Sequence, residues 1–488
     1  MLRYALASAI RDYRATEPVL FAIEPLALRR YKTRVLHKMF FCLAAFLLTP
    51  LIAFGSTNHH VVLITMDGFP AYLLTNEAAP IPTLRKLAKE GAVAEGMKVS
   101  NPSVTWPNHT TLVTGVHPGQ HSVLFNGVLM RPGPRLPVKV DPQRDKSDLV
   151  AVPTLADVLH KAGYRTAGIN WPCTRNSKTL DDDFPDVPQQ ITHSTPRLRE
   201  ELIAEGILKD ATDRSFGAQS AASRDQIWTA AAVRVIEKRR PNFMMFHMLV
   251  TDSTHHKYGA LSPAGYNAVA LVDGQLREVL RALDAAGIRE RTTVFVVADH
   301  GFDKALKILN PNVVLRKAGL LDATSVGQLV RARAQIISEG GTALVYLTNP
   351  ETRDADAAKV RELLREAEGI AEIIEPVRFA ELGYPDPEKN PQMAQMVLAA
   401  KDGYAFNNTV LGEDYVTEVT LEQGSQGHHG YLASNPKMNA VFVAAGRGIK
   451  EGARLGIIEN IHVAPTIAYL LGVELPGARG KVLKEILE

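Results

Sequence analysis

After residue 60, hydrophobic residues gather in short continuous runs that alternate with segments in which they recur every three or four positions. Continuous runs rich in Val, Ile, Phe and Met are typical of strands that are buried on both faces of a parallel sheet. The spacing of three and four is typical of helices with one apolar face. The alternation predicts an α/β protein in which helices sandwich a mostly parallel central sheet.

The predicted strands and helices of this part are spread along most of the chain. The strands are Val61–Thr65, Asn242–Val250, Thr292–Ala298 and Ala440–Ala444. The helices are Pro153–Gly163, Ala264–Ala286 and Ile461–Leu471. We predict that residues 56–303 and 426–488 together form one catalytic domain, because strands of the same type occur in both segments.

The segment from residue 304 to residue 425 has a different pattern. Prolines are frequent, Ala357–Glu368 is a charged helical stretch, and Thr342–Leu347 is an isolated strand-like run. A change of this kind between two stretches of similar pattern indicates an insertion. We therefore predict that residues 304–425 form a cap-like subdomain inserted into the catalytic domain.

The first 55 residues form a basic leader followed by an apolar run. Residues 39–54, MFFCLAAFLLTPLIAF, follow a segment rich in Lys and Arg. The run is shorter than the roughly 20 apolar residues that a spanning helix needs, and Pro50 interrupts it. The layout predicts a signal peptide cleaved near Ser56 and export to the periplasm or the exterior. An uncleaved N-terminal membrane anchor is the alternative.

Composition and charge narrow the possible functions. The chain has 488 residues, of which 46% are hydrophobic and 22% charged, as in folded globular proteins. The net charge is +3, but the first 38 residues hold eight basic and three acidic residues, which leaves 47 basic and 49 acidic residues in the body. No stripe of Lys and Arg is found, so a nucleic-acid-binding surface is excluded and a small-molecule substrate is expected.

Several polar side chains with metal-binding chemistry follow predicted strands or begin predicted helices. Ligand sites in open α/β sheets lie beyond the carboxyl ends of the strands, where these side chains would meet. Two of them, four positions apart on the segment after the Asn242–Val250 strand, share a face if a helical turn follows the strand. A glycine-flanked histidine pair in a late loop adds one more imidazole. The residues are Asp67, Thr105, Asp252, His256, Asp299, His300 and His429.

Thr105 is the predicted nucleophile. Pro107 suits the first turn of a helix, so Thr105 would lie at a helix N-terminus, where free amide groups can hold phosphoryl oxygens. A hydroxyl at this place can attack phosphorus. The alternative is that Thr105 only caps the helix.

The ligand chemistry favours zinc or another first-row divalent ion, because Asp and His are present without a thiolate. Seven ligands are too many for one tetrahedral ion. Two ions that clamp the attacking and leaving oxygens of an in-line displacement would use them all.

The order and identity of these motifs resemble one known family. Asp67-Gly68, Thr-Trp-Pro-Asn-His at 105–109, Asp252-x-x-x-His256, Asp299-His300-Gly301 and His429-Gly430-Tyr431 occur in that order. From residue 60 to 488 the chain resembles the nucleotide pyrophosphatase/phosphodiesterase family of the alkaline phosphatase superfamily. The resemblance implies an alkaline phosphatase-like fold and hydrolysis of phosphodiester or pyrophosphate bonds.

The resemblance also implies a role for each residue. One zinc would bind Asp67, Asp299, His300 and the hydroxyl of Thr105, and the other would bind Asp252, His256 and His429. In-line attack by Thr105 would give a covalent phosphothreonine intermediate. Asn126 matches the family's asparagine that donates to a non-bridging phosphate oxygen.

Two positions affect the expected substrate. Trp106 follows the nucleophile, where the family usually has an aromatic side chain that stacks on a base. His247 stands where nucleotide-cleaving members carry a tyrosine, so this position does not select nucleotides. The expected substrate is a small-molecule phosphodiester, which is a nucleotide, a lipid headgroup diester or another compound. A phosphomonoesterase or a phosphonoacetate-type hydrolase on the same two-metal site is the alternative, and a non-catalytic exported metal-binding protein is a further one. The sequence predicts no oligomeric state.

Overall fold

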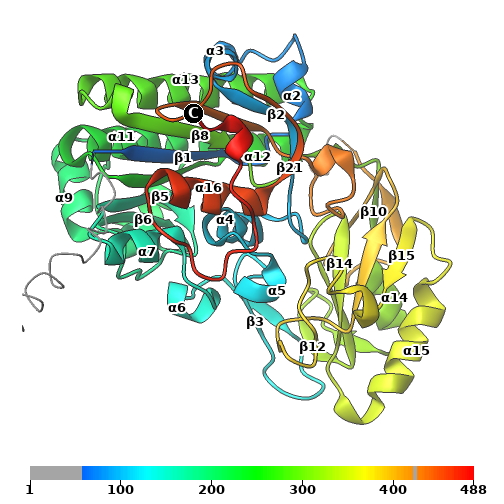
Figure 1. Cartoon of the computed structure of the whole chain (residues 1–488). Coiled ribbons are helices and arrows are strands. Elements are labelled where there is room, and N and C mark those ends of the chain that lie inside the picture. The colour runs from blue at the N-terminus through cyan, green and yellow to red at the C-terminus, as the bar shows by residue number, and fades with distance from the viewer. Residues whose placement is uncertain (1–57, 421–425) are drawn as a thin grey trace, which may run out of the picture. The chain divides into compact units, whose positions relative to one another are not determined.

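The computed structural model describes residues 58–420 and 426–488 (Figure 1). Residues 55–488 form a single compact unit. The predicted leader and apolar run, residues 1–55, lie outside the described residues. Within the described part of the chain, no helix is long and apolar enough to cross a membrane.

An eight-stranded sheet forms the centre of the catalytic part. The strand order is β21-β2-β20-β8-β1-β7-β5-β6, and only β20 runs antiparallel to its neighbours. The fold class predicted from the hydrophobic pattern is therefore confirmed. The strands are β1 His60–Met66, β2 Ala92–Lys98, β5 Thr166–Pro172, β6 Asp182–Asp186, β7 Phe243–Met248, β8 Thr292–Val297, β20 Phe442–Gly446 and β21 Arg454–Glu459.

The three central strands explain the continuous hydrophobic runs. Every residue of β1, β7 and β8 is buried, because β1 pairs in parallel with β7 on one side and with β8 on the other. Helices cover both faces: α11 (Ala221–Arg239) and α13 (Pro263–Ala285) pack together on one face, and α4 (Thr105–Thr114), α7 (Leu155–Lys161) and α16 (Val463–Leu470) lie on the other (Figure 1).

The strand predicted for Asn242–Val250 ends two residues earlier than expected. β7 stops at Met248, and α12 (Val250–Tyr258) begins almost immediately. The carboxylate of Asp225 accepts hydrogen bonds from the amides of Leu249 and Val250, at 2.9 Å each. Because these amides have no partner within the helix, the buried carboxylate fixes the point at which the helix starts.

Residues 304–425 contain a second sheet with its own apolar core. Four antiparallel strands pair in the order β13-β14-β16-β15, and α14 (Pro311–Lys317) and α15 (Arg353–Leu364) accompany them. The predicted isolated strand Thr342–Leu347 is β14, which lies inside this sheet. The strands are β13 Ala334–Ser338, β14 Thr342–Leu347, β15 Ile370–Ile374 and β16 Met396–Ala400.

This second sheet also touches the catalytic part. The hydroxyl of Thr342 donates to the carbonyl of Gly430, at 2.8 Å, beside the predicted ligand His429. Gly383, in the segment between β15 and β16, makes a second contact: its carbonyl accepts from the amide of Gly119, also at 2.8 Å. The boundaries predicted for the insertion remain a prediction, since residues 55–488 form one compact unit.

Candidate active site

Thr105 is the first residue of α4. The preceding residue, Val104, is extended and occupies the N-cap position, and Pro107 lies in the first turn. Thr105 is therefore not the N-cap residue, the alternative that the sequence left open, and capping does not explain its hydroxyl. The side chain is 8% exposed at the end of a helix whose other residues are buried.

His109 connects Thr105 to the central sheet. Its Nδ1 lies 2.9 Å from the carbonyl oxygen of Thr105, one turn earlier on α4. Its Nε2 lies 2.8 Å from Oγ1 of Thr65 on β1. The same Nδ1 is 3.6 Å from Oδ2 of Asp299. His109 therefore holds the first turn of α4 next to the carboxylates at the strand ends.

Asp67 and Asp299 follow the adjacent strands β1 and β8, and both are fully buried. Oδ1 of Asp299 accepts a hydrogen bond from the amide of Gly68 at 3.0 Å. Nε2 of His300 lies 3.4 Å from Oδ1 of Asp67 and 3.3 Å from Oδ2 of Asp299. The ligand atoms of these three side chains lie within 4.8 Å of one another and can hold one metal ion.

A second group of ligand atoms lies beside the first. Asp252 on α12, His300 and His429 also offer atoms within 4.8 Å of one another. Nε2 of His429 lies 3.6 Å from Oδ1 of Asp252, and the ring stacks on His300 with centroids 3.7 Å apart. His256, one turn after Asp252, places Nε2 3.4 Å from the same oxygen. His300 thus belongs to both groups, which the sequence did not predict.

The unpartnered atoms of this cluster fit divalent cations. Among the described residues, four buried side-chain atoms here have no hydrogen-bond partner, namely Asp67 Oδ1, Asp252 Oδ1, Asp299 Oδ2 and His300 Nε2. Buried polar atoms are nearly always paired, and an unpaired one costs about 1–3 kcal/mol. Carboxylate oxygens and imidazole nitrogens together suit zinc or a related ion.

The pKa values of the clustered side chains also favour bound cations. Burial raises the pKa of Asp67 well above its ordinary value, and the nearby carboxyl groups of Asp299 and Asp252 raise it further. Burial, together with the neighbouring rings of His300 and His256, lowers the pKa of His429 well below its ordinary value. A cation between these groups would stabilise the ionised carboxylates and bind the neutral imidazole.

Asn126 lies next to the nucleophile. Its Oδ1 accepts a hydrogen bond from the amide of Trp106 at 2.9 Å. Because the oxygen accepts this bond, the Nδ2 group of the exposed side chain can donate to another partner.

Trp106 is mostly buried, but it lines a cavity of about 290 Å³ together with Asp186 and Gln190. The side chain is 4% exposed, and its indole Nε1 donates to Oδ2 of Asp186 at 3.0 Å. It packs with Val123, Leu149, Cys173 and Val187.

His247 is fully buried behind Asp67. Its Nε2 lies 3.0 Å from Oδ2 of Asp67, and its Nδ1 lies 3.0 Å from the carbonyl oxygen of Asn170. It therefore supports a predicted metal ligand. The substrate contacts predicted for Trp106 and His247 remain predictions, and the complete burial of His247 weighs against its own contact.

Three residues that position the site were missed in the sequence. His109 stands four positions after Thr105, a spacing that places both on one helix face and was available as a signal. Thr251 donates from its hydroxyl to the carbonyl of Asp67 at 2.6 Å. Asp225 caps α12 from a separate helix. Local sequence contains no signal for Asp225, because its partners lie 24 and 25 residues further along the chain.

Comparisons with known proteins agree with this arrangement. The sequence model of the family described as type I phosphodiesterase/nucleotide pyrophosphatase matches residues 61–432. Ectonucleotide pyrophosphatase/phosphodiesterase family member 3 of Rattus norvegicus is 24% identical over 423 residues, which are 86% of this chain and 43% of that protein. A venom phosphodiesterase of Naja atra is 22% identical over 86% of this chain and 45% of its own length. The chain thus spans less than half the length of these relatives.

The solved structure of human ectonucleotide pyrophosphatase/phosphodiesterase 5 has a similar fold. Its TM-score is 0.66 at 16% sequence identity, and the match covers 88% of this chain and all of the other. The family match includes the strand-end residues and the loop that carries His429. The chain therefore belongs to the type I phosphodiesterase/nucleotide pyrophosphatase family.

Proposed function

We propose that this protein is an exported, zinc-dependent phosphodiesterase or nucleotide pyrophosphatase that uses Thr105 as its nucleophile. The observation that carries the proposal is the set of four unpartnered ligand atoms at the strand ends beside the first turn of α4. A hydroxyl at a helix N-terminus next to a two-cation site suits attack on phosphorus.

The metal ligands divide between two sites. Asp67, Asp299, His300 and the Thr105 hydroxyl would hold one zinc, and Asp252, His256 and His429 would hold the other. Bound zinc ions would supply Lewis-acid stabilisation of the attacking and leaving oxygens.

The side chains around Thr105 support the reaction in different ways. His109 holds the backbone of Thr105 in place through its carbonyl oxygen. The Nδ2 group of Asn126 would donate to a non-bridging phosphate oxygen, and such donors contribute most when charge develops in the transition state. The N-terminus of α4 adds the positive end of the helix dipole on the same side.

Known relatives support the substrate class and the export. The curated relatives are named as ectonucleotide pyrophosphatases and venom phosphodiesterases, names that place them outside cells. A murine structure of family member 5 is described as an inactive threonine-to-alanine variant in complex with AMP. We therefore infer that nucleotide diesters are among the substrates and that residues 1–55 direct export.

The ratio of kcat/KM for bis(p-nitrophenyl) phosphate to that for p-nitrophenyl phosphate tests the reaction class. Zinc-loaded protein is expected to give a ratio well above one. A ratio below one would replace the proposal with a phosphomonoesterase or phosphonate hydrolase on the same site.

Substitution of the nucleophile tests the mechanism separately. Thr105→Ala is expected to lower kcat/KM for the diester by about a thousandfold or more, while Thr105→Ser retains a hydroxyl and part of the activity. Thr105 follows the N-cap residue Val104 and does not cap the helix, so the folding of both variants is expected to match the parent. A fully active Thr105→Ala protein would exclude this nucleophile.

A further inference from the structure

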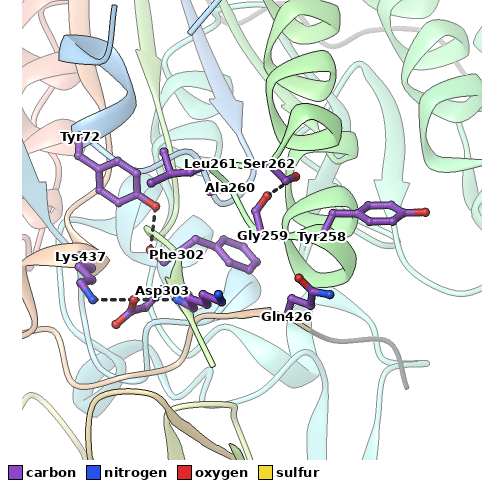
Figure 2. A pocket seen from close by; sticks show the side chains of 11 residues that line it. Tyr72, Tyr258, Gly259, Ala260, Leu261, Ser262, Phe302, Asp303, Gln426 and Lys437 are labelled. Carbon is purple, nitrogen blue, oxygen red and sulfur yellow. Dashed lines mark hydrogen bonds and ion pairs between the residues drawn. The ribbon is translucent and has the colours of Figure 1, made fainter. Parts of the chain in front are cut away.

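The two edges of the central sheet, where its strands begin and end, differ in shape and charge. The carboxyl ends carry the candidate active site, and Figure 2 shows a cavity of about 520 Å³ near it, lined in part by Phe302, Tyr258 and Gln426. The ring of Phe302 lies 4.9 Å from that of His256, measured between centroids. This edge has to stay open to substrate, so a large partner that holds the protein would bind elsewhere.

The opposite edge is formed by the starts of four parallel strands and the end of β20. Phe243, the first residue of β7, pairs with Val61 of β1 and with Thr166, the first residue of β5. β20 runs antiparallel and ends there, with Gly446 opposite Thr293 of β8. The connections that lead into or out of these strands therefore lie together, on the side of the sheet away from the candidate active site.

Basic residues predominate in these connections, which are residues 162–165, 240–242, 286–291 and 447–453. They contain six basic residues and only two acidic ones, Glu290 and Glu451. The chain from residue 39 onward has 47 basic and 49 acidic residues, so the positive excess at this edge is local. Five of the six basic residues are arginines, all at least partly exposed, and they form the arginine face of the molecule: Arg165, Arg240, Arg289, Arg291 and Arg447.

The arginine face keeps its positive charge. Nη1 of Arg447 donates to the carbonyl oxygen of Asn58 at 3.3 Å, and Nη1 of Arg291 donates to the side-chain oxygen of the same residue. Burial lowers the pKa of His60, and guanidinium groups from three of the connections lower it further. Within residues 58–420 and 426–488, none of the five arginines forms an ion pair with an Asp or Glu side chain.

Helix ends explain two of the five arginines. Nε of Arg240 donates to the carbonyl of Ala286, and Nη2 of Arg291 donates to that of Gly287, both at 3.1 Å and both at the C-terminus of α13. Basic side chains at this end of a helix are stabilised by the helix dipole. Arg165 and Arg289 make no side-chain hydrogen bond with any described residue, and Arg447 bonds only to Asn58. Capping of helices therefore leaves three arginines that can serve an external partner.

The polypeptide enters the catalytic part at this same face. Asn58 is the first described residue, and residues 39–54 of the sequence are the predicted signal peptide or membrane anchor. A single weak anchor binds a bilayer reversibly, and a basic surface beside it makes the binding stable. Each arginine near an anionic lipid surface adds about fivefold to the binding constant. Charge complementarity and the place of Asn58 both favour an anionic bilayer as the partner.

We propose that the arginine face docks the protein on a bilayer surface that carries anionic phospholipids. The candidate active site lies at the other edge of the sheet, so docking leaves it open to substrate. The inference is independent of the proposed reaction and adds a membrane surface as a partner of the folded catalytic part.

Binding of the full chain to lipid vesicles tests the proposal. The measured quantity is the ratio of the binding constant for vesicles of equal parts phosphatidylglycerol and phosphatidylcholine to that for pure phosphatidylcholine. A retained apolar run would bind both kinds of vesicle and cancel in the ratio. The parent is expected to give a ratio of about ten or more, which falls as salt is added because salt screens the charges.

The combined change Arg165→Gln, Arg289→Gln and Arg447→Gln is expected to lower this ratio about tenfold or more. The matched control is Lys139→Gln, Arg365→Gln and Lys401→Gln, which removes the same charge from exposed residues outside the face and is expected to keep the parent ratio. Thermal midpoints equal to that of the parent would show that both proteins are folded. If the triple change lowers the midpoint, Arg165→Gln alone replaces it, with an expected loss of about fivefold.

Three outcomes would overturn the proposal. A parent ratio near one would show that the face does not recognise anionic lipid. Equal losses in the variant and the control would assign the binding to overall charge. Tighter binding of the parent to a random-sequence DNA duplex than to the anionic vesicles, at equal phosphate concentration and lost in the same variant, would assign the face to nucleic acid.

Discussion

Two buried aspartates, one from each part of the molecule, show how the catalytic part differs from the inserted segment. Asp67, at the end of β1, and Asp356, in α15, are exposed by no more than 1%. Both oxygens of Asp356 are bonded, Oδ1 by Arg333 and Oδ2 by the hydroxyl of Thr352. Oδ1 of Asp67 has no hydrogen-bond partner among the described residues. The Asp356 carboxylate is part of the packing, whereas that of Asp67 is arranged for a ligand that protein atoms do not replace.

The free-energy cost explains the contrast. A buried charge is tolerated when paired and hydrogen-bonded, as Asp356 is. Three carboxyl groups gather with imidazoles at the strand ends. Among the described residues, Asp67, Asp252 and Asp299 form ion pairs with histidines and with no Lys or Arg. This excess of negative charge at the strand ends of the central sheet is the physical reason to expect cations there.

Substitution of Asp67 tests whether this aspartate is arranged as a metal ligand, and it has the largest expected effect. Asp67→Asn is expected to lower diester kcat/KM of the zinc-loaded protein about a thousandfold, since it weakens metal binding and orientation. In zinc-free protein the same change is expected to raise the thermal midpoint, because it removes a carboxyl group whose pKa burial raises. A lower midpoint in the zinc-free variant would mean that Asp67 is structural.

Asp356→Asn tests whether the buried aspartate of the inserted segment is part of the packing. It removes the charge from the hydrogen bonds with Arg333, whose side chain is 41% exposed, and is expected to lower the free energy of unfolding by about 2 kcal/mol. Urea unfolding with and without a chelator measures this, and the loss is expected to be the same in both conditions. Dependence of the loss on zinc would break the contrast between the two regions.

Asp225 lies between these extremes, since it is buried and bonded but only to backbone amides. Burial raises its pKa from 3.8 to about 7. The folded protein therefore binds a proton between about pH 4 and 7 that the unfolded chain does not bind, and this contribution to stability falls as the pH rises through that window.

The measurement for Asp225 compares two proteins at two pH values. From about pH 5 to about pH 8, the zinc-free parent is expected to lose about 2 kcal/mol of unfolding free energy relative to Asp225→Asn. Other titrating groups are common to both proteins and cancel in the difference. An unchanged difference would show that the two amide hydrogen bonds outweigh desolvation.

His247 gives the smallest expected effect. Its contact with Oδ2 of Asp67 orients a predicted metal ligand, and loss of such contacts typically costs about tenfold in metal affinity. His247→Gln is therefore expected to weaken zinc binding about tenfold in a chelator competition. His121→Gln, another fully buried histidine, bonded to Thr111, is the control and is expected to leave zinc affinity unchanged. Equal effects of the two changes would assign His247 a packing role alone.

The sequence by itself determined four neighbouring strands of the central sheet, the order of the motifs and the place where they meet. Continuous apolar runs predicted β1 and β8 within one residue at each end, because burial on both faces leaves a local signature. Parallel strands end at a common edge, so Asp67 and Asp299 could be placed together without coordinates.

Only the tertiary structure decided how each side chain is used. The structure buried His247 behind Asp67, bonded the indole of Trp106 to Asp186, brought His300 between two ligand groups and left a cavity beside His256. These outcomes depend on packing between residues far apart in the chain. Hydrophobic periodicity encodes which face of an element is buried, but the partner that a buried polar atom finds, or fails to find, is set by the whole fold.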